Sequence, residues 1–249
     1  MKEIRLNKKD LLLLKQIPKS NPESNLYVLG NDLLKIYNIS QTEKNKIKQR
    51  VELIDETNIK ETKNFLWLNS EIYINESFSG FSMKYLRDYE VIAKMDYKHP
   101  HILKILKNLS TSLKTIHEKE VYIGDLNTHN VMYKGSKSFF IDTDSINYQN
   151  KISNSISKFL YDFGFSNLSD KTDNFSLAYI ALILLTDYDA FAKNKMDLIQ
   201  KVEQLKLHKD LSFLKEILIK EENIYLSDHI DNFKNFEYNK DTKKFEKKQ

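Results

Sequence analysis

The chain has 249 residues, of which 41% are hydrophobic and 30% are charged, and its formal net charge is +4. This composition is ordinary for a globular protein with one larger domain or two lobes, and the charge is too small to indicate nucleic-acid binding, although it suits a phosphate-rich ligand. The absence of cysteine excludes disulfides and thiolate metal sites.

The N-terminal segment MKEIRLNKKD is followed by only four leucines, which is too short for a secretory core or a membrane span. We therefore expect a cytoplasmic protein that does not enter a membrane. Leu11–Ile17 is apolar and predicts a short helix or a first strand. Leu26–Gly30 and Asp32–Tyr37 predict two strands joined by a turn at Gly30 and Asn31.

The second of these strands contains a lysine, Lys35, in the apolar run LLKIY. A charged amine in such a run must be solvated or paired, because burying it alone is costly. One interpretation is an edge strand from which the amine points to water. The other is that the amine binds a ligand.

The next segments alternate between helix and strand signals. Gln41–Thr57 predicts a helix, because Ile47, Val51 and Ile54 fall on one face. Phe65–Ile74 and Phe81–Leu86 predict a hairpin whose connection is Asn75–Gly80.

The pattern from Arg87 onward is helical. Asp88–Met95 predicts a short helix, and Pro100 is placed to open a long one with an apolar stripe from Ile102 to Ile116. Further along, the sequence predicts a buried helix at Asp173–Thr186 and two more helices at Met196–Leu205 and Leu211–Ile219. After Phe233 it predicts a lysine-rich tail that is frayed or solvated.

The most informative stretch is Val121–Ser145, which reads VYIGDLNTHNVMYKGSKSFFIDTDS. Two short apolar pieces flank a turn at Gly135, which is typical of a hairpin and brings Asn130 near Asp142. Asp125 lies on the loop just before them. Carboxylate and amide oxygens suit a hard divalent cation such as Mg²⁺, which binds them together with phosphate oxygens.

The order D-x-x-x-x-N, a hairpin and then I-D resembles the catalytic loop and metal-binding aspartate of the protein-kinase-like superfamily. The wording GDLNTHNVM…FFIDTDS is also similar to aminoglycoside and choline kinase relatives. The resemblance implies an α+β, bilobal fold within one kinase-like domain. Residues 1–86 would form a small lobe with an antiparallel nucleotide-binding sheet and a hinge, and residues 87–249 would form a mainly helical lobe with the catalytic loop.

The same resemblance implies ATP and Mg²⁺ as cofactors and assigns the nucleotide site. Lys35 would hold the α and β phosphates, and a helix glutamate would pair with it. Glu52 is our choice for that glutamate, with Glu43 and Glu56 as competitors. Met83 would lie near the gatekeeper position, and the hinge whose backbone meets adenine would be Lys84, Tyr85 and Leu86.

On the other side of the nucleotide, Asn130 and Asp142 would bind Mg²⁺, and Asp125 would orient the acceptor hydroxyl. Asp144 would either add a second carboxylate to the metal or cap the turn. Two further residues match supporting positions in the family. His117 would pack and hydrogen-bond before the loop, and Asp173 would hold the loop backbone or cap its own helix.

The sequence also departs from the family. It has only five glycines, of which only Gly30 precedes residue 80, so a glycine-rich phosphate-binding loop near the N-terminus is excluded. Gly124 replaces the arginine before the catalytic aspartate, and Asn127 replaces the lysine typical of Ser/Thr kinases. A second candidate for the metal aspartate is Asp162, in the triplet D-F-G, but no short strand leads to it from Asn130, which favours Asp142.

Three functions follow from these observations. The first is an ATP-dependent kinase whose acceptor is a protein Ser or Thr hydroxyl. The second is a small-molecule kinase of the aminoglycoside or choline type. The third is a nucleotide-binding pseudokinase, which the missing glycine loop favours and the retained Lys35, Asp125, Asn130 and Asp142 oppose.

Overall fold

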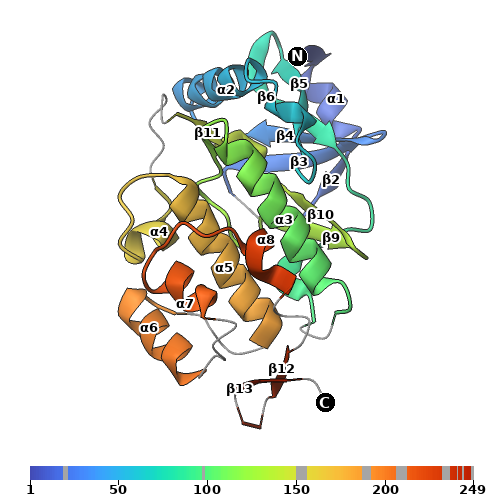
Figure 1. Ribbon diagram of the computed structural model, residues 1–249. Coiled ribbons are helices and arrows are strands. Elements are labelled where there is room, and N and C mark those ends of the chain that lie inside the picture. Colours follow the sequence, from blue (N-terminus) through green and yellow to red (C-terminus); the bar gives the residue numbers. More distant parts are fainter. Residues whose placement is uncertain are drawn as a thin grey trace.

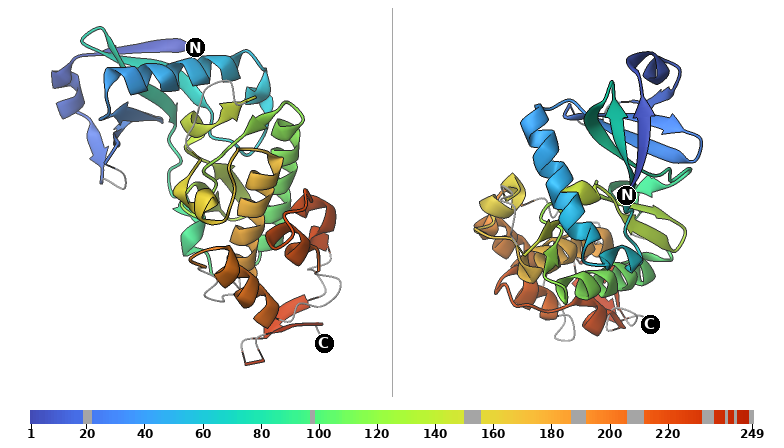
Figure 2. Two further views of the ribbon diagram at one scale, coloured as in Figure 1. Left: turned by 90° about the vertical axis from the view of Figure 1, so that its left-hand side faces the viewer. Right: turned by 90° about the horizontal axis from the view of Figure 1, so that it is seen from above.

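The computed structural model describes residues 1–18, 22–96, 99–149, 156–186, 192–205, 212–231, 236–239, 241–242 and 244–247. The protein is α+β, as predicted. A six-stranded sheet drawn from the first third of the chain lies at one end, and most of the helices lie at the other end (Figures 1 and 2).

The large sheet has the strand order β1-β5-β6-β4-β3-β2. Its strands are β1 (Lys2–Leu6), β2 (Lys15–Ile17), β3 (Ser24–Leu29), β4 (Asp32–Tyr37), β5 (Leu68–Ile74) and β6 (Ser77–Lys84). β1 pairs with β5 in parallel, and all the other pairs are antiparallel. The prediction of an antiparallel sheet is therefore wrong at this edge, where residues 2–6 add a parallel strand that was not predicted and that packs Ile4 and Leu6 against the core of the sheet.

The β3–β4 hairpin follows the prediction, with its turn at Gly30, which has φ 60°. β4 is a central strand, because it pairs with β3 on one side and with β6 on the other. Lys35 lies opposite Leu26 and Phe81 in these pairs, and its side chain is 12% exposed. The interpretation of Lys35 as an edge-strand residue pointing to water is therefore wrong.

The β5–β6 hairpin has a much tighter turn than predicted. Asn75 and Glu76 form it, with φ of 47° and 64°, as a two-residue hairpin turn requires. Gly80 belongs to β6 instead, at a point where a Cβ atom would lie 1.9 Å from the Lys35 carbonyl oxygen. The glycine thus marks a close approach of two strands, which sequence alone does not distinguish from a turn.

Two helices accompany the sheet: α1 (Lys8–Leu12) and α2 (Gln41–Asp55). The predicted alternatives for residues 11–17 both occur, since α1 is followed by β2. α2 starts at Ser40, whose hydroxyl and Glu43 form a capping box, and it buries Val51 and Ile54. Lys48 of α2 lies 2.8 Å from Glu71 of β5, which ties the helix to the sheet.

The helical end is built around α3 (Ile102–His117) and α5 (Asp170–Thr186), which pack together as Figure 1 shows. Both were predicted, and the apolar stripe of α3 is buried as expected. The other elements of this end are η2 (Ile92–Lys94), β7 (Glu90–Val91), β8 (Val121–Tyr122), β9 (Val131–Lys134), β10 (Lys137–Phe140), η3 (Thr143–Ser145), β11 (Asn147–Tyr148), α4 (Lys158–Asp162), α6 (Lys195–Gln204), α7 (Phe213–Leu218) and α8 (Leu226–His229).

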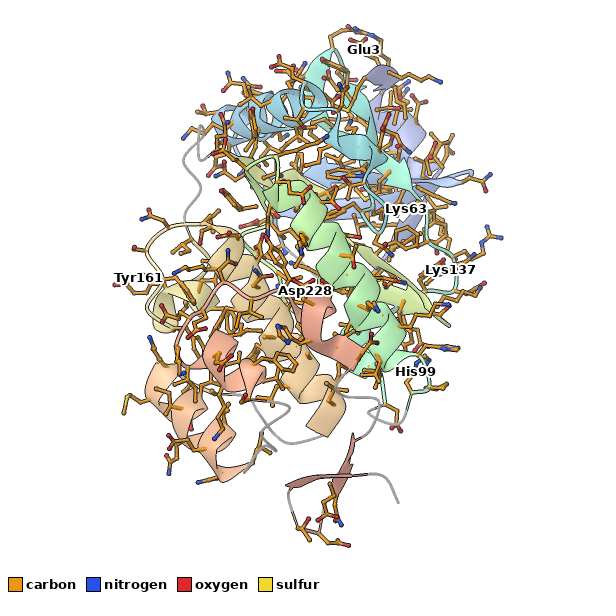
Figure 3. The ribbon with its side chains drawn as sticks, viewed as in Figure 1. Glu3, Lys63, His99, Lys137, Tyr161 and Asp228 are labelled. Atoms are coloured by element: carbon orange, nitrogen blue, oxygen red, sulfur yellow. The ribbon has the colours of Figure 1, made fainter. Side chains whose placement is uncertain are left out.

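Several of these differ from the prediction. The helix predicted at Asp88–Met95 is a two-residue strand followed by a 3₁₀ turn. α8 had no sequence signal, and Figure 3 shows its Asp228 beside α3, where Lys114 Nζ lies 3.2 Å from the carboxylate. Leu211 lies outside the described residues.

The C-terminal tail was predicted to be frayed or solvated. It is not frayed throughout, since β12 (Phe236–Asn239) and β13 (Lys244–Lys247) form an antiparallel hairpin near the C-terminus (Figure 1). No helix in the described part of the chain has the length and apolar character needed to cross a membrane.

The main hydrophobic core crosses the lobe boundary predicted after residue 86. Ile54, Ile59 and Phe65 belong to the same buried cluster as the apolar faces of α3 and α5. Phe65 packs on Phe140 with ring centroids 4.8 Å apart, and the Leu66 amide donates to the Phe140 carbonyl over 2.8 Å. The connection between α2 and β5, including the 3₁₀ turn η1 (Ile59–Glu61), therefore holds the sheet end to the helical end.

The close approach at Gly80 yields a prediction. Gly80→Ala should lower the free energy of unfolding by about 1–3 kcal/mol, because its Cβ would overlap the backbone carbonyl of Lys35. Urea unfolding measures this, with Ser77→Ala in the exposed start of the same strand as the control. A Gly80→Ala protein as stable as its control would contradict the packing described.

Candidate functional site

The amine of Lys35 forms the centre of the candidate site. It contacts the carboxylate of Asp142 directly and lies 2.9 Å from that of Asp144. These partners follow it by 107 and 109 residues, so the contact joins the large sheet to the segment after β10. The structure thus brings Lys35 and Asp142 together, as expected, and adds Asp144, whose contact with Lys35 was not predicted.

The three charges shift one another's pKa values. Burial by itself would lower the pKa of Lys35, but the charges of Asp144 and Asp142 outweigh it and raise that pKa. Burial, followed by the charge of Asp144, raises the pKa of Asp142 to about 6. For Asp144, the penalty of burial is outweighed by Lys35 and by the Tyr37 hydroxyl, so its pKa is lowered. The carboxylates of Asp142 and Asp144 therefore share the Lys35 amine, and the two carboxyl pKa values shift in opposite directions.

Tyr37 and Arg50 complete this cluster, and sequence reasoning missed both. The Tyr37 hydroxyl donates to Asp144, and burial, followed by the charge of Asp144, raises the pKa of this tyrosine well above its usual range. Burial lowers the pKa of Arg50, and attraction to Asp144 opposes that effect. The available signals were weak. Tyr37 is two residues from Lys35 on the same strand face, and Arg50 is three residues from Ile47 on the inner face of α2.

The helix glutamate predicted to hold Lys35 is not there. The Glu52 side chain is 50% exposed, and its ion-pair partner is Lys48, one turn earlier, at 3.8 Å. Glu43 is used in the N-terminal cap of α2, and Glu56 is exposed just after the helix ends. The assignment of Glu52 is wrong because helical spacing identifies the buried face but not which residue beside it reaches a partner on another element.

Asp125 and Asn130 lie on the loop between β8 and β9. The Asn130 side-chain amide donates to the Asp125 backbone carbonyl at 2.8 Å and to its carboxylate at 3.2 Å. Burial raises the pKa of Asp125, partly offset by hydrogen bonds from Asn127 and Asn130. The Ile141 amide donates to the Asn130 carbonyl at 2.9 Å, which links this loop to the strand that leads to Asp142.

Asp173, at the start of α5, fixes the backbone of this loop. Its carboxylate, 1% exposed, accepts hydrogen bonds from the amides of Ile123 and Gly124 at 2.8 and 3.1 Å. It also lies 2.9 Å from His117 Nε2, and His117 Nδ1 lies 3.0 Å from the Tyr225 hydroxyl. The predicted contact of Asp173 with the loop backbone is confirmed, and so is the structural role predicted for His117.

Asp142 has a left-handed backbone conformation, with φ 64° and ψ 38°. This is an uncommon geometry for a residue with a side chain, although aspartate tolerates it better than most. It turns the chain from β10 into the 3₁₀ turn η3, so that Asp142 and Asp144 both meet Lys35. One prediction was that Asp144 caps this turn. It does not, because its oxygens bind Lys35 and Tyr37.

Two cavities meet at the Lys35–Asp142 pair. One, of about 650 Å³, is mainly apolar and is lined by Leu33, Met83, Lys84, Tyr85, Leu86 and Met132, among others. The other, of about 380 Å³, is more polar and is lined by Ile47, Arg50, Asp125, Asp144, Ser157 and Leu168, among others. Both are also lined by Ser24, Lys35 and Asp142.

The four residues predicted to meet a nucleotide base, Met83 to Leu86, therefore lie on the apolar cavity. Met83 is buried in β6, and the chain leaves the sheet after Lys84. The Tyr85 amide donates to the Asn31 carbonyl over 2.8 Å, which fixes this exit segment against the β3–β4 turn. A planar apolar ligand in this cavity would lie within reach of Lys35.

The alternative metal aspartate, Asp162, lies elsewhere. It ends α4, is paired with Lys158 at 2.6 Å and lines neither cavity. Its neighbour Phe163 is buried in the core, and Tyr161, labelled in Figure 3, projects outward with 70% of its surface exposed. The D-F-G triplet is therefore part of a core-anchoring turn.

The oxygen atoms beside Lys35 fit a divalent cation. Asp142 is partly exposed and lines both cavities, and Asn130 offers an amide oxygen on the apolar one. Among the described residues, no three His, Cys, Asp or Glu side chains could hold a metal by themselves. These residues therefore suit Mg²⁺ that takes its other ligands from phosphate and water.

Comparison with known proteins does not place the chain in a family. No protein-family model matches it, and no curated protein matches its sequence.

Asp142 yields a prediction about pH and stability. Because its folded-state pKa, about 6, exceeds its ordinary value of 3.8, its contribution to stability is complete below 3.8 and is lost as the pH rises through about 6. In EDTA, the wild type should lose stability between about pH 5 and pH 7.5, and Asp142→Asn should lose less. Urea unfolding at the two pH values measures this. An identical loss in both proteins would contradict the assignment.

Asp173 yields a second prediction. Asp173→Asn should lower the free energy of unfolding by about 2–4 kcal/mol, because an amide nitrogen would replace one oxygen that accepts buried hydrogen bonds. Asp162→Asn is the matched control and should change it by less than about 1 kcal/mol, since its ion pair is at the surface. Equal effects on the urea midpoint would show that the loop does not depend on Asp173.

Proposed function

We propose that this protein is an ATP-dependent phosphotransferase with a kinase-like bilobal fold, which moves the γ-phosphate of Mg²⁺-ATP to a hydroxyl group. The observation that carries the proposal is the convergence of Lys35 and Asp142 at the junction of two cavities, with Asn130 on one and Asp125 on the other. Phosphoryl transfer needs an amine, a metal-binding carboxylate and a carboxylate near the acceptor in this kind of arrangement.

The apolar cavity suits the nucleotide. Its volume, about 650 Å³, is within the range of small-molecule sites, and its apolar walls suit a purine ring. The segment Met83–Leu86 on one wall offers backbone groups to the base, and Lys35 at the inner end offers an amine to the phosphates. Asp142 and Asn130 would hold Mg²⁺, which would neutralise phosphate charge during transfer.

The polar cavity suits the acceptor. Asp125 lies on its wall, and its raised pKa, caused mainly by burial, favours a carboxylate that accepts a proton from a hydroxyl. Asn127 and Asn130 donate hydrogen bonds around Asp125 and fix its position. The protein's contribution is then mainly orientation and electrostatic stabilisation, for which one lost group costs about 10²–10³-fold in rate.

The preferred acceptor is a Ser or Thr hydroxyl of a protein, since the segments around Lys35 and Met83 resemble protein kinases. A small hydroxyl compound is the second candidate, because the polar cavity is about 380 Å³ and is walled by α2 and by residues after 156. A pseudokinase is the third, favoured by the absence of a helix glutamate on Lys35.

The proposal predicts that purified protein transfers labelled phosphate from ATP in the presence of Mg²⁺. Asp125→Ala and Asp142→Ala should each lower the rate by about 10²–10³-fold, and Asp125→Ala should still bind ATP. Asp162→Ala is the matched control and should keep the wild-type rate, because Asp162 lies outside both cavities.

The acceptor classes are distinguished by which acceptor must be added to the assay for ATP to be consumed. Labelling of the protein itself or of lysate proteins favours a protein kinase, and ATP consumption only with added small alcohols or aminoglycosides favours a small-molecule kinase. Thermal stabilisation by ATP without transfer to either class indicates a pseudokinase. If the protein neither binds ATP nor transfers phosphate, the proposal is overturned.

A further inference from the structure

Asp144 is more deeply buried than either of the charged groups beside it, Lys35 and Asp142. Its side chain is 6% exposed, compared with 33% for Asp142, and both of its oxygens have partners. One partner is the Lys35 amine at 2.9 Å, and the other is the Tyr37 hydroxyl. A carboxylate in this position has little capacity left for a further ligand.

Asp142 also contacts the Lys35 amine, but it is more exposed than Asp144. It lines both cavities, whereas Asp144 lines only the polar one. Two aspartates separated by one residue therefore have different surroundings: Asp142 borders the apolar cavity, where a nucleotide would bind, and Asp144 does not. This difference suggests different tasks.

We propose that Asp144 is the positioning residue for the Lys35 amine, in place of a helix glutamate, and that Asp142 alone supplies the carboxylate to Mg²⁺. This inference rests on the proposed function and assigns separate roles within the same site. It reverses the usual expectation that the partner of Lys35 comes from α2, where Glu52 is exposed.

The surroundings of Asp144 support this division. Tyr37 is on the same strand as Lys35, two residues on, so the strand supplies both the amine and a hydroxyl that fixes the carboxylate. The Lys35 amine also lies 5.7 Å from the centre of the Tyr37 ring, within cation–π range. α2 faces Asp144 with a cation, Arg50, so the helix is attracted to the site by a charge opposite to that of a glutamate.

The kinetic test compares three isosteric variants in the phosphate-transfer assay at varied Mg²⁺ and ATP. Asp144→Asn should lower kcat by about 10²-fold with little change in the ATP KM or in the half-saturating Mg²⁺ concentration. Asp142→Asn should raise the half-saturating Mg²⁺ concentration. Glu52→Gln should behave as the wild type. Asp144→Glu, which keeps the charge, should recover part of the lost rate.

Two results would overturn the proposal. If Asp144→Asn raises the Mg²⁺ requirement as Asp142→Asn does, Asp144 is a metal ligand. If Glu52→Gln loses as much rate as Asp144→Asn, the helix glutamate holds Lys35 during turnover. Tyr37→Phe removes one hydrogen bond to Asp144 but leaves the charge of Asp144 in place, so it should lower kcat less than Asp144→Asn does. It replaces Asp144→Asn in the test if that variant folds poorly.

A second measurement does not depend on catalysis. Urea midpoints of Asp144→Asn, Lys35→Met and the double variant test whether the two residues act as a pair. Asp144→Asn should lower the midpoint in the wild type and leave it unchanged or raise it in Lys35→Met, because the buried carboxylate then has no amine. Glu52→Gln should have the same small effect in both backgrounds.

The two measurements separate the inference from the proposed function. If the wild type transfers no phosphate, the proposed function fails, while the urea cycle still decides whether Asp144 holds Lys35. Additive effects of Lys35→Met and Asp144→Asn on the midpoint would overturn the pairing, whatever the activity.

Discussion

The amine of Lys35 lies between two carboxylates that follow it by more than 100 residues, and the rest of the site depends on this contact. Burying three charges is costly unless they remain paired, so the sheet and the segment after β10 must meet at one point with little freedom. Two unusual backbone features serve this meeting. Gly80 lets β6 approach the Lys35 carbonyl, and Asp142 takes a left-handed conformation that directs two aspartates to the amine.

The loop that carries Asp125 is held by a separate set of buried hydrogen bonds. Asp173, at the start of a helix buried in the main core, accepts from the backbone of Ile123 and Gly124, next to Asp125 on the wall of the polar cavity. Loops carry functional groups well when a rigid element fixes their backbone. The main core also includes residues of the connection between α2 and β5, so the sheet end and the helical end are packed together in one core.

The charges around Lys35 come from different elements than the family resemblance implies. α2 contributes a cation, Arg50, near the site, and its Lys48 pairs with Glu71 on the sheet. In this pair the lysine is on the helix and the carboxylate is on the sheet, whereas the resemblance implies a lysine on the sheet and a glutamate on the helix. The carboxylate that remains beside Lys35 comes from Asp144 instead. The amine therefore has a buried partner that comes from the segment after β10 and not from α2.

The sequence alone determined the elements whose signals are local. The apolar periodicities of α2, α3 and α5 and the turn signals of the β3–β4 and β9–β10 hairpins report on neighbours a few residues away, and each of these elements is present. The spacing of Asp125, Asn130 and Asp142 also indicated that they share one loop and hairpin, as the structure has them.

Only the tertiary structure decided which long-range partners meet. The pairing of β1 with β5, the role of Gly80, the hairpin in the tail and the choice of Asp144 over Glu52 all depend on contacts between distant segments. A sequence pattern shows which side chains share a face of one element. It does not show how deeply that face is buried or which charge from another element lies within bonding distance, and these two quantities determine the free energy of a buried ion pair.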